Sequence, residues 1–193
     1  NVNLDLMYGL PGQSLTGVLA DLRQAVDLAP EHLSWYQLTL EPNTAFYRAP
    51  PPLPDDERIA DMSDAGLALL EEAGYARYEI SAFARPGRQC RHNLNYWSFG
   101  DYLAVGAGAH GKLTTAEGTL RYRKSANPLQ YMQQVEAGCE PGATAVVGGA
   151  DLLFEFMLNA LRLVDGFDEQ LFTDRTGLPR RLLRERLAPL VTK

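Results

Sequence analysis

The chain has 193 residues, a formal net charge of −6 and a hydrophobic content of 46%, which fits one or two globular domains with an ordinary core. The acidic balance argues against a nucleic-acid partner, which usually requires a basic face. No stretch reaches the roughly 18 consecutive apolar residues of a membrane span. Two cysteines far apart in sequence, Cys90 and Cys139, suggest no disulfide framework, so we expect a reducing, cytoplasmic location.

The first predicted element is a strand over residues 2–8, which ends at the turn Gly9-Leu10-Pro11-Gly12-Gln13. An apolar run that ends in glycine and proline is typical of a central parallel strand, buried on both faces. Because a native chain rarely begins in such a strand, we expect an internal piece of a larger enzyme. The glycines would let the backbone approach a ligand closely; a tight turn between strand and helix is the alternative.

A βαβ unit is predicted next. Apolar residues at three-to-four spacing indicate a helix over residues 14–29, with Ser14 as N-cap and Pro30 after its end. Residues 32–40 are predicted to form the second strand. Strand, helix and strand within about 35 residues predict two parallel strands joined by a right-handed crossover.

A proline-rich loop over residues 41–54 leaves no room for regular structure. A helix is predicted for residues 56–73, with Gly74 after its end, followed by a short strand over residues 75–80. Residues 84–100 are predicted to form a polar, aromatic loop.

Short strands and then helices are predicted for the rest of the chain. The strands are 102–105, 111–115 and 120–123, and the helices are 127–137, 149–164, 167–173 and 179–189. We place a domain boundary near 116–126, which divides the chain into residues 1–120 and a helical part, 121–193.

Asp5 is an acid inside an otherwise apolar strand. A buried carboxylate is costly unless it is paired. Asp5 therefore either binds a ligand near the C-terminal end of its strand, or pairs with a neighbouring backbone group or arginine.

Residues 92–97, His-Asn-Leu-Asn-Tyr-Trp, form the densest polar and aromatic segment. The imidazole of His92 can bind a metal or haem iron or transfer a proton, and the rings suit a planar ligand. The alternative is that His92 bonds to the loop while the rings fill the core. Cys90 could join a metal or haem site, and His110, in the small-residue turn 106–111, is a second candidate histidine.

Taken together, six segments resemble the radical S-adenosylmethionine proteins related to oxygen-independent coproporphyrinogen III oxidase, and in particular their haem-chaperone branch. The segments are Asp5–Gln13, Leu33–Leu38, Glu41–Thr44, Gly74-Tyr75, His92–Trp97 and Gly108–Gly111. The hallmark of the branch is a His-Asn-x-x-Tyr-Trp stretch, which Trp97 completes. The resemblance runs from residue 1 to about 125 and continues more weakly to the end.

The resemblance implies an α/β fold: the C-terminal part of a partial (β/α)6 radical S-adenosylmethionine barrel, followed by a small, mainly helical C-terminal domain. It also implies S-adenosylmethionine, a [4Fe–4S] cluster and haem as cofactors. The cluster of such proteins is held by a Cys-x-x-x-Cys-x-x-Cys loop, which this chain does not contain. The chain is therefore expected to carry only the last two barrel strands and the segments C-terminal to them.

The resemblance also assigns roles to four residues. Asp5 corresponds to the family's acid near the ribose of S-adenosylmethionine, while Met7 and Thr39 fall where strands line the adenosyl pocket. His92 corresponds to the histidine associated with haem, and is a candidate ligand of the haem iron.

Haem handling is therefore the first functional expectation: a chaperone that binds haem and hands it to acceptor proteins. The alternatives are an oxygen-independent coproporphyrinogen III oxidase, which decarboxylates two propionate side chains oxidatively, and an inactive structural fragment. Peripheral membrane association is compatible with the resemblance. A homodimer is compatible with half a barrel, whose exposed edge strand could pair with a second copy.

Overall fold

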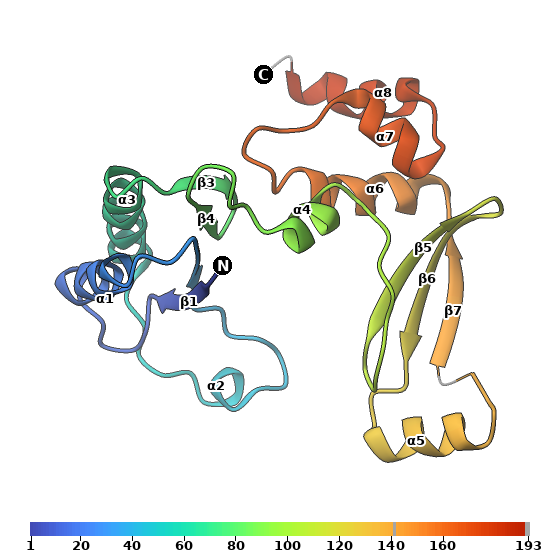
Figure 1. The fold of residues 1–193 in the computed structure, drawn as a ribbon, viewed down its shortest axis with the longest axis horizontal. Coiled ribbons are helices and arrows are strands. Elements are labelled where there is room, and N and C mark those ends of the chain that lie inside the picture. The colour runs from blue at the N-terminus through green and yellow to red at the C-terminus, as the bar shows by residue number, and fades with distance from the viewer. Residues whose placement is uncertain (141, 192–193) are drawn as a thin grey trace. The chain divides into compact units, whose positions relative to one another are not determined.

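The computed structural model describes residues 1–140 and 142–191 (Figure 1). The chain divides into two compact units, Asn1–Cys90 and Arg91–Lys193. The predicted division at residues 120 and 121 differs from this one, because both residues lie inside one strand of the second unit. As a division into functional domains it stays a prediction. Among the described residues, no helix is both long and apolar enough to span a membrane.

A four-stranded sheet organises the first unit. Its order is β1 (Asn3–Tyr8), β2 (His32–Gln37), β4 (Ala82–Ala84) and β3 (Ala76–Glu79). β1 and β2 are parallel, whereas β2–β4 and β4–β3 are antiparallel. Helix α1 (Leu15–Asp27) connects β1 to β2, which confirms the predicted βαβ unit.

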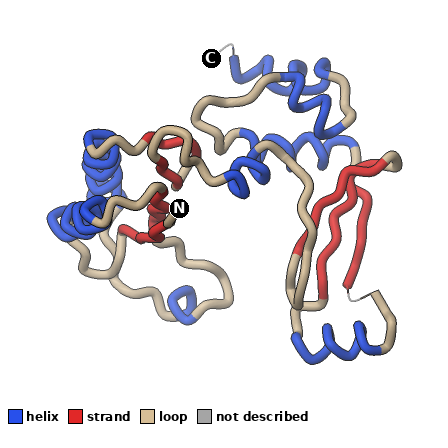
Figure 2. Tube along the Cα trace, in the orientation of Figure 1, coloured by secondary structure: helices blue, strands red, loops and turns tan. Residues whose placement is uncertain are grey.

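Two helices cover one face of this sheet. α1 packs against α3 (Asp56–Glu72), and Figures 1 and 2 show both on the same side of the strands. α1 begins as predicted, because the Ser14 hydroxyl accepts a hydrogen bond from the Gly17 N–H at 3.1 Å. The core between helices and sheet contains Tyr8, Val18, Leu22, Ala25, Leu33, Trp35, Met62, Leu70, Tyr75 and Phe83.

Three predictions about the first unit are wrong. β1 is an edge strand of the described sheet. It is not buried on both faces, because exposed residues alternate along it with buried or half-buried ones. β2 ends at Gln37 instead of residue 40. The proline-rich loop contains one helical turn, α2 (Ala45–Arg48), which the Thr44 hydroxyl caps by accepting from the Tyr47 N–H.

An antiparallel sheet organises the first part of the second unit. Its order is β5 (His110–Thr115), β6 (Gly118–Lys124) and β7 (Gly142–Val147). Helix α5 (Pro128–Glu136) lies between β6 and β7 in sequence. The sequence prediction missed β7, and the expected strand at 102–105 is reduced to a single bridge with β5.

Helices form the rest of the second unit. The residues expected to form a polar loop contain α4 (Arg91–Trp97). The last three predicted helices are confirmed as α6 (Gly149–Ala160), α7 (Glu169–Thr176) and α8 (Arg180–Val191). Their core contains Phe99, Leu152, Phe156, Ala160, Phe172 and Leu183.

Candidate functional site

One face of the first unit's sheet is polar, and Asp5 lies on it. In the parallel ladder, Asp5 is in register with Ser34, and Asn3 with His32. Residues in register point to the same face of a sheet. This face is therefore opposite to the one that carries Leu4, Leu6 and Tyr8 against the helices. Asp5 is exposed, whereas His32 and Ser34 are buried.

A hydrogen-bond network fixes these polar side chains. The Asn3 amide donates to Asp5 Oδ1 at 2.8 Å, and its oxygen accepts from Ser34 Oγ at 3.1 Å. His32 Nδ1 lies 2.6 Å from the same Asn3 oxygen, and Nε2 lies 2.7 Å from the Tyr78 hydroxyl. With Nδ1 donating to Asn3, Nε2 accepts from Tyr78. The network thus holds the Asp5 carboxylate at an open edge.

Burial makes His32 favour its neutral form. Loss of solvent lowers the pKa of His32, and the negative charges of Asp5 and Glu79 offset only part of that effect. A neutral imidazole can donate from one nitrogen and accept at the other, as the network requires. His32, Asn3 and Tyr78 were missed by the sequence prediction. The period-two spacing of Asn3 with Asp5 and of His32 with Ser34 was the available signal.

Met7 and Thr39, the other two candidates for S-adenosylmethionine, have different positions. Met7 is in register with Tyr36 on the polar face, and each of the two residues is 43% exposed. Thr39 is exposed too and lies two residues beyond the end of β2, outside the sheet. The structure thus brings Asp5 and Met7 onto one face and leaves Thr39 in the loop after β2.

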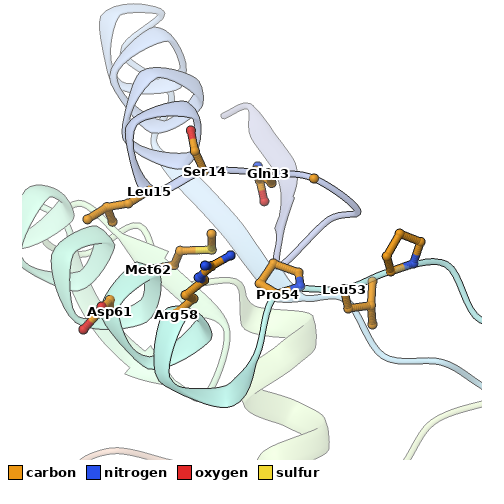
Figure 3. A pocket seen from close by; sticks show the side chains of 10 residues that line it. Gln13, Ser14, Leu15, Leu53, Pro54, Arg58, Asp61 and Met62 are labelled. Atoms are coloured by element: carbon orange, nitrogen blue, oxygen red, sulfur yellow. The ribbon is translucent and has the colours of Figure 1, made fainter.

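The turn after β1 borders a pocket of about 540 Å³ (Figure 3). The pocket lies between the first turns of α1 and α3, where Figure 3 shows Gln13 and Ser14 across from Arg58 and Met62. Gly9 and Gly12 have φ angles of +72° and +69°, which residues other than glycine rarely adopt. Turn geometry therefore accounts for both glycines without a ligand.

His92, the candidate haem ligand, lies on α4 in the second unit. Its ring meets Tyr96 edge to face at 4.7 Å between centroids, and Tyr96 in turn packs on Tyr102 at 4.3 Å. His92 is exposed, and its ring nitrogens have no hydrogen-bond partner among the residues that the structure describes. An exposed imidazole with a free nitrogen beside flat aromatic faces could bind haem iron if haem were present.

Trp97 completes this aromatic segment. Arg162 covers its ring at 4.2 Å, and its buried indole N–H has no acceptor in the described part of the chain. Cys90 is the last residue of the first unit, and its backbone N–H donates to the Tyr78 hydroxyl at 3.3 Å.

In residues 1–140 and 142–191, no three His, Cys, Asp or Glu side chains are grouped as metal ligands. These residues therefore do not fit a [4Fe–4S] cluster, which usually needs three or four thiolates.

The sheet of the second unit carries cationic side chains that the sequence analysis did not identify as candidate site residues. Lys112 is 1% exposed, and its Nζ donates to Asp101 Oδ1 at 2.9 Å and to the Phe99 carbonyl at 3.0 Å. Burial lowers the pKa of Lys112, although the bond to Asp101 opposes that shift. Arg121, its partner across the ladder, pairs with Glu155 at 2.7 Å. The signal in the sequence was the recurrence of basic residues two positions apart in β5 and in β6.

Comparison with known proteins shows which proteins this chain is similar to. Residues 149–193 match the HemN C-terminal domain family. The chain is 50% identical over 186 residues to the heme chaperone HemW of Escherichia coli, covering 96% of this chain and 48% of that protein. It is 48% identical, with the same shares, to the heme chaperone HemW of Haemophilus influenzae. The chain thus spans about half the length of these relatives.

Two further proteins extend the comparison. The mouse protein "Radical S-adenosyl methionine domain-containing protein 1, mitochondrial" is 35% identical over 179 residues, covering 88% of this chain and 40% of that one. The solved structure described as "Coproporphyrinogen III oxidase (HemN) from Escherichia coli is a Radical SAM enzyme" matches with a TM-score of 0.74 and 20% identity. That match covers 98% of this chain and 48% of the other.

The fold is therefore the mixed α/β fold of the C-terminal portion of a radical S-adenosylmethionine protein. With the family match and the two HemW relatives, the chain belongs to the HemN/HemW family. The family resemblance and the fold class predicted from the sequence are confirmed.

Proposed function

We propose that the protein is a haem-binding chaperone. The observation that carries this proposal is His92: an exposed imidazole, with no partner for its ring nitrogens among the described residues, packed at 4.7 Å against Tyr96. Such a group can bind haem iron directly, and the neighbouring rings offer an apolar surface to the macrocycle. The two relatives at 48% and 50% identity are named heme chaperones.

We also propose that the whole protein binds S-adenosylmethionine and a [4Fe–4S] cluster. The polar face of the first unit supports the first part, because Asp5 is held by Asn3 at 2.8 Å yet stays exposed. Asp5 would accept hydrogen bonds from ribose hydroxyls, and Met7 and Thr39 would contact the adenosyl group. The cluster, which supplies an electron when it is bound, would need thiolates from outside this chain.

A second candidate function is oxygen-independent coproporphyrinogen III oxidation. It is favoured by the fold shared with a structure described as such an oxidase. It would use the same Asp5 face for S-adenosylmethionine. Anaerobic assay of the whole protein with cluster, S-adenosylmethionine, an electron donor and coproporphyrinogen III distinguishes the two, because only the oxidase releases CO₂.

The proposed chaperone would pass haem to acceptor proteins in the cytoplasm. Both cysteines are free thiols, which agrees with a reducing compartment. Peripheral membrane association and a homodimer stay predictions.

The test is a haem titration of the whole protein and of His92→Ala, followed in the visible spectrum. We expect a saturable Soret shift that is lost or moved in the variant, because the iron loses its nitrogen ligand. Arg91→Gln is the matched control, since it changes the adjacent exposed residue of α4 and should keep the wild-type spectrum. An unchanged spectrum and affinity in His92→Ala would overturn the proposal.

A further inference from the structure

A second pocket, of about 510 Å³, opens on the three-stranded sheet of the second unit. Its lining includes His110 from β5, Arg121 and Arg123 from β6, and one carboxylate, Glu155. His110 is in register with Arg123, and alternate residues along a strand share a face. The histidine and the two arginines therefore point from the same face of the sheet.

The positive charge of this face is only partly neutralised. Arg121 donates to Glu155 from two nitrogens, at 2.8 and 2.7 Å. Arg123, by contrast, is exposed and its side chain has no ion pair or hydrogen bond to any described residue. His110, directly across from it, has no such partner either among the residues that the structure covers. Arg123 therefore carries a positive charge that no described acid neutralises, and an exposed, unpaired guanidinium of this kind suits an anion.

The third strand leaves this charge accessible. In the ladder between β6 and β7, Arg123 is in register with Ala143, and Arg121 with Ala145. Both alanines line the pocket, and a methyl group cannot cover a guanidinium. The planar fork of an arginine binds a carboxylate through two parallel hydrogen bonds.

Aromatic rings connect this pocket to His92 within the same unit. His92 contacts Tyr96 at 4.7 Å, and Tyr96 contacts Tyr102 at 4.3 Å. Tyr102 lines the pocket, and its hydroxyl accepts a hydrogen bond from Arg121. A continuous row of contacts thus runs from the candidate iron ligand to the cationic face.

We propose that this pocket binds the carboxylate side chains of the tetrapyrrole, with Arg123 as the main contact and His110 beside it. The proposal rests on the proposed function and deepens it. Haem carries its iron at the centre of a flat ring and two propionate carboxylates at one edge. A ring lying along the tyrosines would direct those carboxylates to Arg123 while His92 faces the iron.

The test compares two ligands and three variants in the whole protein. The ligands are haem and its dimethyl ester, in which both carboxylates are masked. Arg123→Gln should weaken haem binding about tenfold, the loss expected for a hydrogen-bonded ion pair, and should leave the affinity for the ester unchanged. Arg123→Lys, which keeps the charge without the fork, should lose less. Arg181→Gln, a charge removed from α8, is the matched control.

Metal-free coproporphyrin, with four propionates and no iron, separates this proposal from the haem function. Its binding should be weakened by Arg123→Gln and unaffected by His92→Ala, because coproporphyrin without iron has no metal for His92 to bind. Coproporphyrin binding without iron ligation would keep the pocket assignment and reject His92. Equal losses of haem and ester in Arg123→Gln, no loss at all, or no coproporphyrin binding would each overturn the pocket assignment.

Discussion

His32 shows at the residue scale how a buried polar group supports an exposed one. It lies between Asn3 at 2.6 Å and Tyr78 at 2.7 Å. Asn3, held in this way, donates a hydrogen bond to the Asp5 carboxylate. Substitution of any member of this chain of hydrogen bonds is therefore expected to reach the Asp5 carboxylate. Tyr78 also accepts the backbone N–H of Cys90, so the network extends to the end of the first unit.

We predict that the first unit loses stability as the pH falls from about 7 to about 5.5, around the ordinary pKa of histidine. Burial lowers the pKa of His32 in the folded state. The unfolded chain therefore binds the proton at a higher pH, and protonation favours unfolding. The charges of Asp5 and Glu79 oppose the shift without cancelling it.

Urea denaturation at several pH values measures this effect. The free energy of unfolding of wild type should fall over that range more steeply than that of His32→Gln, which cannot titrate there. Parallel curves for the two proteins would show that His32 is not responsible.

At the element scale, the close contact between α3 and the sheet depends on one small residue, Gly66. A Cβ atom at Gly66 would overlap the six-membered ring of the Trp35 indole, and Trp35 is 4% exposed in the core. Glycine inside a helix normally lowers stability relative to alanine. At this position it lets the indole pack directly against the helix backbone.

We predict that Gly66→Ala lowers the free energy of unfolding by about 2 kcal/mol, because the core cannot admit the methyl group without moving Trp35. Gly17→Ala in α1 is the matched control. Its Cβ would meet the Ser14 hydroxyl at an ordinary 3.4 Å, so the change should raise stability by about 0.5 kcal/mol. Thermal or urea unfolding measures both; a neutral or stabilising Gly66→Ala would contradict the packing account.

Elements were predictable where one periodic pattern decides their structure. α1, α3 and α6 follow from apolar stripes with a cap or a glycine at an end. α4 was missed because its seven residues are too few for a stripe. β7 was missed because Gly142–Val147 forms a strand only by pairing with β6.

At the scale of the whole molecule, the chain has two hydrophobic cores that share no residue. Each unit contains one tryptophan: Trp35 lies in the first core, and Trp97 on α4 belongs to the second unit. The fluorescence of each tryptophan can therefore report the unfolding of its own unit.

We predict that Phe156→Ala destabilises the second unit selectively, by about 3 kcal/mol, the usual cost of a large cavity. Phe156 is fully buried, and its ring contacts Phe99, Phe167 and Phe172 at 5.1 to 5.6 Å. The transition of Trp97, measured in a Trp35→Phe background, should shift to lower urea. The transition of Trp35, measured in a Trp97→Phe background, should stay in place; equal shifts would mean that the two units unfold together.

The sequence by itself determined the βαβ unit, the helices with strong periodicity and the family, because each of these depends on residues close together in the chain. It also pointed to Asp5 and His92. Only the tertiary structure decided what surrounds them. Tyr78 meets His32 across 46 residues of sequence, and Arg123 faces Ala143 through the register of two strands. Contacts of this kind depend on how distant segments pair, which no local pattern records.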